Sequence, residues 1–232
     1  YSLALADFNQ CLKLNPKHEI YLRDRARAKS LLKKTGAALQ DLDLAIFLAP
    51  KSAHLFTERG LLRQKAEDWQ GSLGDLQRAC ILDPKTARGW LELGLLREQL
   101  DNSQGALEAL SKSLAIRGSA RGFGARGLLY AELKMTDTAL RDYDQAVRLG
   151  LKNEDVFLGR AELKSGGEPA SAIKDYSSAI ALNNKRSRSY YDRALLFSKS
   201  GQLIEAKRDM NRAISLGLTD NFVYLQRAVL FL

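Results

Sequence analysis

The sequence predicts an all-α fold of repeated antiparallel helix hairpins, and three observations support this prediction. First, Pro16, Pro50 and Pro84 follow one another at intervals of 34 residues, each at the end of a similar apolar segment. Second, small and bulky residues recur at spacings of three and four, which place side chains on one face of a helix. Third, the 232 residues contain no apolar run of the ~18 residues that span a membrane. We therefore expect a single array of about fourteen helices over residues 1–232.

The second helix of each expected hairpin has a small residue, a bulky residue four positions later, and another small residue three positions after that. Small residues let a neighbouring helix approach closely, and the Pro or Gly that follows ends the helix. Examples are Ala4/Phe8/Cys11, Ala38/Leu42/Ala45, Ala106/Leu110/Ser113, Ala139/Tyr143/Ala146, Ala172/Tyr176/Ala179 and Ala206/Met210/Ala213.

The first helix of each hairpin has a bulky residue four positions before a small one. The repeat is therefore a hairpin of 34 residues, and we expect six full hairpins between about residue 19 and residue 220, with half a hairpin at each end. Two steps are one residue shorter, near Gly118 and near Gly166. The first-helix pairs are Leu22/Ala26, Phe56/Gly60, Trp90/Gly94, Phe123/Gly127, Phe157/Ala161, Tyr190/Ala194 and Tyr224/Ala228.

This pattern resembles the tetratricopeptide repeat family, whose first helix has Trp or Leu, Gly and Tyr and whose second helix has Ala, Phe, Ala and Pro. The resemblance implies a right-handed α-solenoid, the tetratricopeptide superhelix. It also implies a non-enzymatic scaffold or adaptor that binds a protein segment in the groove lined by its first helices.

An arginine precedes the small residue of most first helices, and an aspartate recurs in most second helices. The single hairpin that lacks the arginine, at Leu93, also lacks the aspartate, at Ala109. A partly buried charge left without its partner is costly, so the joint loss predicts an ion pair across each of the other hairpins. The expected pairs are Arg25–Asp41, Arg59–Asp75, Arg126–Asp142, Arg160–Asp175 and Arg193–Asp209.

The resemblance places the predicted groove on the first helices. Its leucines would form an apolar strip, its glycines and alanine would leave a pocket, and its arginines would attract a partner with acidic residues. The alternative is that the leucines only pack first helices together. The predicted groove residues are Arg88, Leu91, Leu95, Arg121, Gly124, Ala125, Leu128, Leu158, Gly159, Arg188, Tyr191 and Leu195.

The carboxylate-binding set of chaperone-binding relatives is not expected to carry over to this chain. The positions that match it hold Arg23, Arg27, Glu58, Arg88 and Glu92, and the two acids would repel a carboxylate.

We expect no enzyme, no cofactor and no metal site. The sequence GFGARG, from Gly122 to Gly127, lies inside a predicted helix, whereas the dinucleotide fingerprint follows a strand. His18 and His54 have no ligand spacing, and Cys11 and Cys80 fall in packing faces as core thiols. Two cysteines do not make a disulfide scaffold, and we expect a reducing, cytoplasmic location.

The net charge of +9 leaves a second function open, that of an RNA-binding or acidic-ligand-binding solenoid. Basic residues gather at 17–34 and at Lys185, Arg186 and Arg188. A third alternative is an architectural spacer or oligomerisation segment of a larger protein.

The final segment, AVLFL, is apolar, and the expected partner helices of Asp7 and Arg227 are missing from the sequence. From this we expect a fragment of a longer protein, with self-association through the apolar end as a further option.

Overall fold

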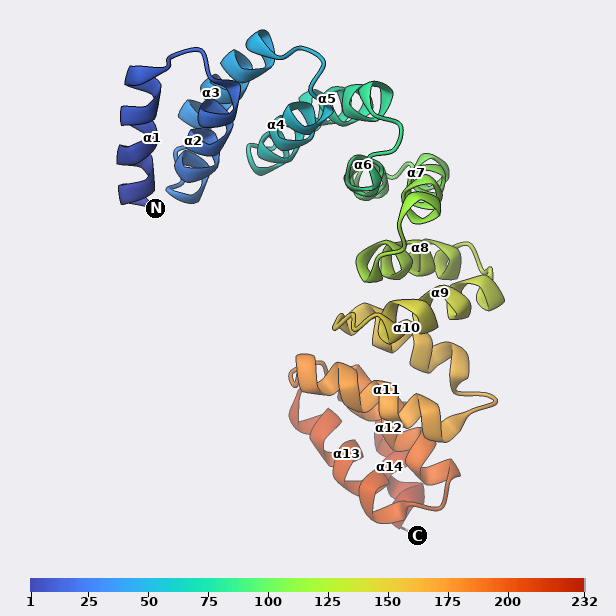
Figure 1. Ribbon diagram of the computed structural model, residues 1–232. Coiled ribbons are helices and arrows are strands. Elements are labelled where there is room, and N and C mark those ends of the chain that lie inside the picture. Colours follow the sequence, from blue (N-terminus) through green and yellow to red (C-terminus); the bar gives the residue numbers. More distant parts are fainter. Residues whose placement is uncertain (232) are drawn as a thin grey trace. The chain divides into compact units, whose positions relative to one another are not determined.

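The computed structural model describes residues 1–231, and its regular elements in that range are fourteen α-helices (Figure 1). The chain divides into two compact units, Tyr1–Gly118 and Ser119–Leu232, and each is described by itself. Unit 1 contains α1 (Ser2–Leu14), α2 (Glu19–Leu31), α3 (Thr35–Leu48), α4 (Ala53–Lys65), α5 (Trp69–Leu82), α6 (Ala87–Gln99) and α7 (Ser103–Ile116). Unit 2 contains α8 (Ala120–Glu132), α9 (Thr136–Arg148), α10 (Glu154–Lys164), α11 (Pro169–Leu182), α12 (Ser187–Lys199), α13 (Leu203–Ser215) and α14 (Asn221–Phe231).

The predicted fold class is confirmed, because the even-numbered helices are first helices and each one from α2 to α12 packs against the odd-numbered second helix that follows it. The small residues lie at these contacts. Ala26, Ala38 and Ala106 have at most 1% of their surface exposed. A β-carbon added to Gly94 would lie only 2.7 Å from Cγ of Leu110, so a larger residue there would push α6 and α7 apart. The core of each unit is therefore a series of small residues and the bulky side chains that fill the space beside them.

The turn inside most hairpins contains a residue in the left-handed backbone region. The φ angles are 59° at Lys33, 60° at Glu67, 57° at Asp101 and 60° at Lys134, and only Gly201 has the residue type that favours this region. Each of these residues comes two positions before a second helix begins. In these hairpins the left-handed residue helps to reverse the chain within a short turn.

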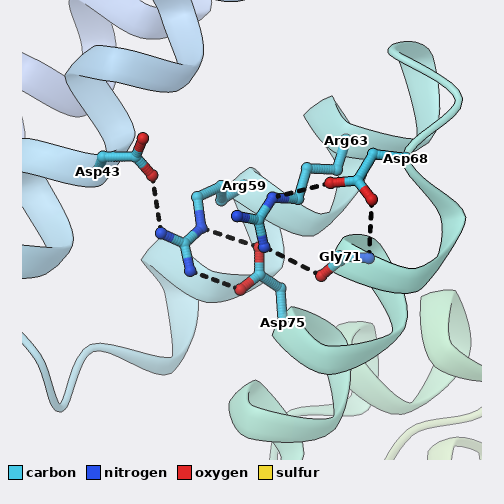
Figure 2. A network of polar contacts seen from close by, with 6 residues as sticks. All are labelled: Asp43, Arg59, Arg63, Asp68, Gly71 and Asp75. Atoms are coloured by element: carbon cyan, nitrogen blue, oxygen red, sulfur yellow. Dashed lines mark hydrogen bonds and ion pairs between the residues drawn. The ribbon is translucent and has the colours of Figure 1, made fainter.

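All five predicted Arg–Asp pairs are present, and each is bidentate. In hairpin α4–α5, Nε and Nη2 of Arg59 donate to the two carboxylate oxygens of Asp75 at 2.9 and 2.7 Å (Figure 2). Arg193 and Asp209 form the same two bonds at 2.6 and 2.9 Å. The aspartates are 1–5% exposed, so each carboxylate is held away from water and neutralised by its arginine. The same geometry joins Arg25 to Asp41, Arg126 to Asp142 and Arg160 to Asp175.

The third nitrogen of the arginine connects the hairpin to the one before it. Nη1 of Arg59 donates to Asp43 on α3 at 2.8 Å, and Nη1 of Arg193 donates to the Ser177 hydroxyl on α11 at 2.8 Å (Figure 2 shows the first of these). One guanidinium therefore joins three consecutive helices. The same contact links Arg25 to Asn9, Arg160 to Asp144 and Arg227 to Asn211.

The exceptional hairpin, α6–α7, replaces the ion pair by apolar contact. Leu93 is 1% exposed and Ala109 is completely buried. The two belong to one apolar cluster with Leu76, Cys80 and Leu96. An arginine at position 93 would enter this cluster without a carboxylate, and this explains why both charged residues are missing together.

Removing one member of a pair should cost more than removing both. Asp209→Ala leaves the Arg193 guanidinium without its carboxylate and should lower the free energy of unfolding by about 2 kcal/mol, less than for a fully buried pair. Adding Arg193→Leu should recover part of this loss. Chemical denaturation of the four proteins of the cycle measures the coupling, and strictly additive losses would reject a structural pair.

Candidate functional site

The exposed charges on the first helices of unit 1 form the candidate site. Nη1 of Arg88 on α6 donates to Oε1 of Glu58 on α4 at 2.9 Å, so the two helices are connected across this face. His54, one turn before Glu58, has its Nε2 at 3.9 Å from the same carboxylate oxygen. On α2, Arg23 pairs with the adjacent Asp24 at 2.8 Å. We call the set Arg23, Arg27, His54 and Arg88 the basic cluster of unit 1.

The charge around His54 is predominantly positive. Partial burial lowers the pKa of the imidazole below its ordinary value of 6.5, and the positive charges of Arg23, Arg88 and Arg27 lower it further. Glu58 acts in the opposite direction but does not reverse the shift, because burial is the larger effect. Burial and the neighbouring arginines thus both favour the neutral form of this imidazole.

This geometry changes the expectation for the positions that match the carboxylate-binding set of chaperone-binding relatives. The sequence alone predicts that Glu58 and Glu92 would repel a carboxylate. In the structure, Glu58 is ion-paired with Arg88 and only 14% of its side chain is exposed, while Glu92 is buried. Arg27 remains exposed on the same face. The acids therefore oppose an incoming anion less than the sequence suggests.

The predicted groove residues differ in how exposed their side chains are. Arg88, Arg121 and Arg188 are exposed, and Leu91, Leu95, Ala125, Leu128 and Leu195 are half-buried. Arg188 pairs with Asp192 at 2.9 Å and lies over the Tyr191 ring, 5.0 Å from its centroid. The exposed arginines and half-buried leucines can contact a ligand, and they belong to both units.

Two of the predicted apolar groove residues are instead part of the core of unit 2. Leu158 is 7% exposed and packs in the cluster of Ala161, Ala172 and Tyr176. Tyr191 is 2% exposed and packs with Met210 and its neighbours. These two residues therefore pack within the core, against second helices, and do not line a groove.

The pocket expected at the groove glycines is also wrong. A β-carbon on Gly124 would lie 2.5 Å from Cδ2 of Leu151, and one on Gly159 would lie 2.6 Å from the hydroxyl of Tyr143. Both glycines thus face neighbouring side chains. A side chain at Gly124 would displace the end of the flexible Leu151 side chain, and one at Gly159 would displace the buried Tyr143 ring.

Other chemistry suggested by sequence motifs is accounted for by packing. The segment Gly122 to Gly127 lies within α8, where Ser119 caps the Gly122 amide and Tyr143 fills the space beside Gly127. Burial raises the pKa of the Cys80 thiol to about 11, which keeps it protonated. Within residues 1–231, no three His, Cys, Asp or Glu side chains gather around a possible metal position. No helix in this range has the length and apolar character needed to cross a membrane.

Comparison with known proteins identifies the repeat. A tetratricopeptide repeat model matches residues 187–216, which cover α12 and α13. Human tetratricopeptide repeat protein 36 is 32% identical over 97 residues, 40% of this chain and 51% of that protein. The chain thus matches about half the length of this curated relative.

Solved structures agree on the fold. The pilF protein of Pseudomonas aeruginosa has a TM-score of 0.74 at 17% identity, covering 91% of this chain and 96% of its own. YrrB, described as a tetratricopeptide repeat protein with an unusual peptide-binding site, has a TM-score of 0.68 at 15% identity, covering 81% of this chain and 97% of its own. The chain has the fold of these tetratricopeptide repeat structures, an α-solenoid of helix hairpins, as the resemblance in its sequence predicts.

Replacement by alanine should change the stability in opposite directions at a helical glycine that contacts a neighbouring side chain and at one that has open space beside it. Gly159→Ala forces a methyl group against the buried Tyr143 ring and should lower the free energy of unfolding by about 1–3 kcal/mol. Gly74 lies inside α5, and a methyl group added there would have no neighbouring atom within 4 Å. Gly74→Ala should therefore raise the free energy of unfolding by about 0.5–1 kcal/mol. Urea denaturation of both variants checks this, and equal destabilisation would contradict the packing described for Gly159.

Proposed function

We propose that the protein is a non-enzymatic interaction scaffold whose unit 1 binds an acidic protein segment over helices α2, α4 and α6. The observation behind the proposal is the basic cluster of unit 1, in which Arg27, His54 and Arg88 are exposed on three successive first helices. An array of tetratricopeptide repeats is a fold suited to binding protein segments along its first helices.

Arg27 is the residue best placed to meet an incoming carboxylate. Arg23 and Arg88 already have acidic partners, Asp24 and Glu58, whereas Arg27 is exposed on the same helix face. A carboxylate of the ligand would gain a charge-assisted hydrogen bond from Arg27 without breaking an existing pair. Leu61 and Leu95, both half-buried on α4 and α6, offer apolar contacts beside the charges.

The charge pattern favours an acidic protein segment over RNA. In the basic group at residues 185–188, Arg186 bonds to Glu154 and Asp155, and Arg188 bonds to Asp192. In the group at residues 17–34, Arg25 and Lys29 both contact Asp41. Several basic residues of these two groups are thus ion-paired within the protein. A polyanion contacting many phosphates would also need more unpaired cations than the basic cluster supplies.

A pair of labelled peptides tests the proposal, one of alternating Leu and Glu and one of alternating Leu and Lys. Fluorescence anisotropy should detect binding of the acidic peptide and weaker binding of the basic one. Arg27→Glu should reduce affinity for the acidic peptide at least about fivefold, as expected for loss of a favourable charge contact. The matched control, Arg208→Glu on the exposed surface of α13, should leave affinity unchanged. Equal losses in both variants would show a response to net charge alone and would overturn the assignment to unit 1.

Binding of the acidic peptide should strengthen as pH falls from 8 to 6. The free imidazole of His54 has a lowered pKa, and a nearby ligand carboxylate would raise it, so the complex takes up a proton that the free protein lacks. The complex is therefore favoured below the pKa of its own imidazole. His54→Gln should remove this added pH dependence while retaining binding at pH 8. A pH profile identical in the variant would place the ligand elsewhere.

A further inference from the structure

The second helices α3 and α5 each expose a large apolar side chain in their last turn. Phe47 on α3 is 79% exposed, and Ile81 on α5 is 68% exposed. Both helices lie inside unit 1, because α2 and α4 pack against α3 while α4 and α6 pack against α5. The two side chains are therefore exposed even though the neighbouring first helices are in place.

The repeat does not need a large apolar residue at these positions. Phe47 and Ile81 are 34 residues apart and occupy the same place in two successive hairpins. The second helices of the later hairpins have small or charged residues at that place, namely Ala115, Arg148, Ala181 and Ser215. Leu44, one turn before Phe47, is 44% exposed and extends the apolar stripe on α3. Exposed apolar side chains on two successive repeats indicate a surface that binds a partner.

Exposed cations lie close to both apolar side chains in the sequence. Lys51 and Lys85 follow Phe47 and Ile81 by four residues, in the turns after α3 and α5, and Arg78 lies one turn before Ile81. Within residues 1–231, these three cations form no ion pair. We call Leu44, Phe47, Lys51, Arg78, Ile81 and Lys85 the amphipathic face of unit 1.

The nearby acids do little to neutralise these cations. Asp43 on α3 is ion-paired with Arg59 at 2.8 Å. Asp83 uses its Oδ1 to accept the backbone N–H of Lys85 at 3.0 Å, which fixes the turn after α5. The amphipathic face is therefore positively charged, and it combines this charge with apolar side chains.

This combination favours a lipid surface over other occupants. A second copy of the chain would bring the same cations against one another. Nucleic acid would leave Ile81 without a role, because isoleucine has no ring on which a base can stack. A protein segment would have to fit two separate side chains on α3 and α5, which are not consecutive helices. Lipids are fluid and can surround separate apolar side chains without a preformed groove.

We propose that the amphipathic face of unit 1 binds the surface of a bilayer that contains anionic lipids. Phe47 and Ile81 enter the boundary between headgroups and acyl chains, and the three cations contact the anionic headgroups. Both contributions are needed, since weak apolar insertion requires a basic surface for stable binding. The basic cluster of unit 1 belongs to the first helices, so this face on the second helices is a different surface.

Co-sedimentation of the whole chain with vesicles tests the proposal, using phosphatidylcholine alone and phosphatidylcholine mixed with phosphatidylserine. The protein should bind the mixed vesicles and not the neutral ones. Phe47→Ser combined with Ile81→Ser should reduce the affinity at least about fivefold through lost insertion. Lys51→Glu combined with Lys85→Glu should reduce it at least about tenfold, since each cation near an anionic surface contributes roughly fivefold.

Matched variants separate this face from net charge and from general apolar exposure. Ile204→Ser removes a side chain that is 73% exposed on α13. Arg27→Glu combined with Arg208→Glu makes the same charge change at exposed positions of α2 and α13. Both controls should stay within about twofold of the wild-type affinity, because salt screens charges that lie away from the lipid. Losses equal to those of the test variants would overturn the proposal, and circular dichroism checks that every variant is folded.

Tryptophan fluorescence shows which side chain enters the lipid. Phe47→Trp should emit at shorter wavelength on mixed vesicles than in buffer, whereas Ile204→Trp should not change. Trp69 and Trp90 are present in both variants, so their contribution is the same. An unshifted Phe47→Trp spectrum would overturn the proposal, as would a wild-type chain that does not bind the mixed vesicles. Loss of affinity for the labelled acidic peptide in Phe47→Ser, without vesicle binding by the wild type, would assign the face to a protein segment instead.

Discussion

One guanidinium group that joins three helices is the interaction on which the arrangement of most repeats depends. Two nitrogens fix the register of a hairpin through the aspartate, and the third fixes the step to the previous hairpin. The aspartates are buried, and a buried carboxylate without its arginine is costly. Each hairpin that has the aspartate therefore needs the arginine as well. Lysine cannot replace arginine in this position, because it lacks the planar donors that bind two carboxylate oxygens and a third acceptor together.

Aromatic rings help to hold the same group in place. In unit 2, the Arg126 guanidinium lies 5.9 Å from the Phe123 ring centroid and 5.6 Å from that of Tyr130. Arg193 is similarly placed near Tyr190 and Phe197. These rings cover the guanidinium faces while its edges make hydrogen bonds, so the arginine loses little favourable interaction on leaving water. The structural arginines are thereby distinct from Arg27, which is exposed and stands beside the proposed ligand site.

The sequence was sufficient for the helices and the Arg–Asp pairs but not for the groove. The pairs could be predicted because Leu93 and Ala109 change together, which reveals a mutual dependence within one chain. The third arginine contact could not be predicted in this way, because its acceptor has no constant residue type. Asn9, Asp43 and Ser177 all accept this hydrogen bond. The sequence alone also does not show why a glycine occurs in a helix. The space beside its α-carbon is empty at Gly74, whereas a neighbouring side chain fills it at Gly159. Only the positions of Leu151 and Tyr143 distinguish the two cases for Gly124 and Gly159.

The left-handed turn residues have a consequence for how such a protein can change over evolutionary time. Lysine, glutamate or aspartate in this conformation costs roughly 1 kcal/mol relative to glycine, yet glycine would lose a similar amount through the greater freedom of the unfolded chain. The two effects nearly cancel, so stability hardly distinguishes glycine from these unbranched charged residues at such positions. Lys33, Glu67, Asp101 and Lys134 are all exposed, and they differ in sign. The turns therefore offer places where mutation can adjust the net charge of the protein, and with it solubility and long-range attraction to partners, while the packing between helices stays unchanged.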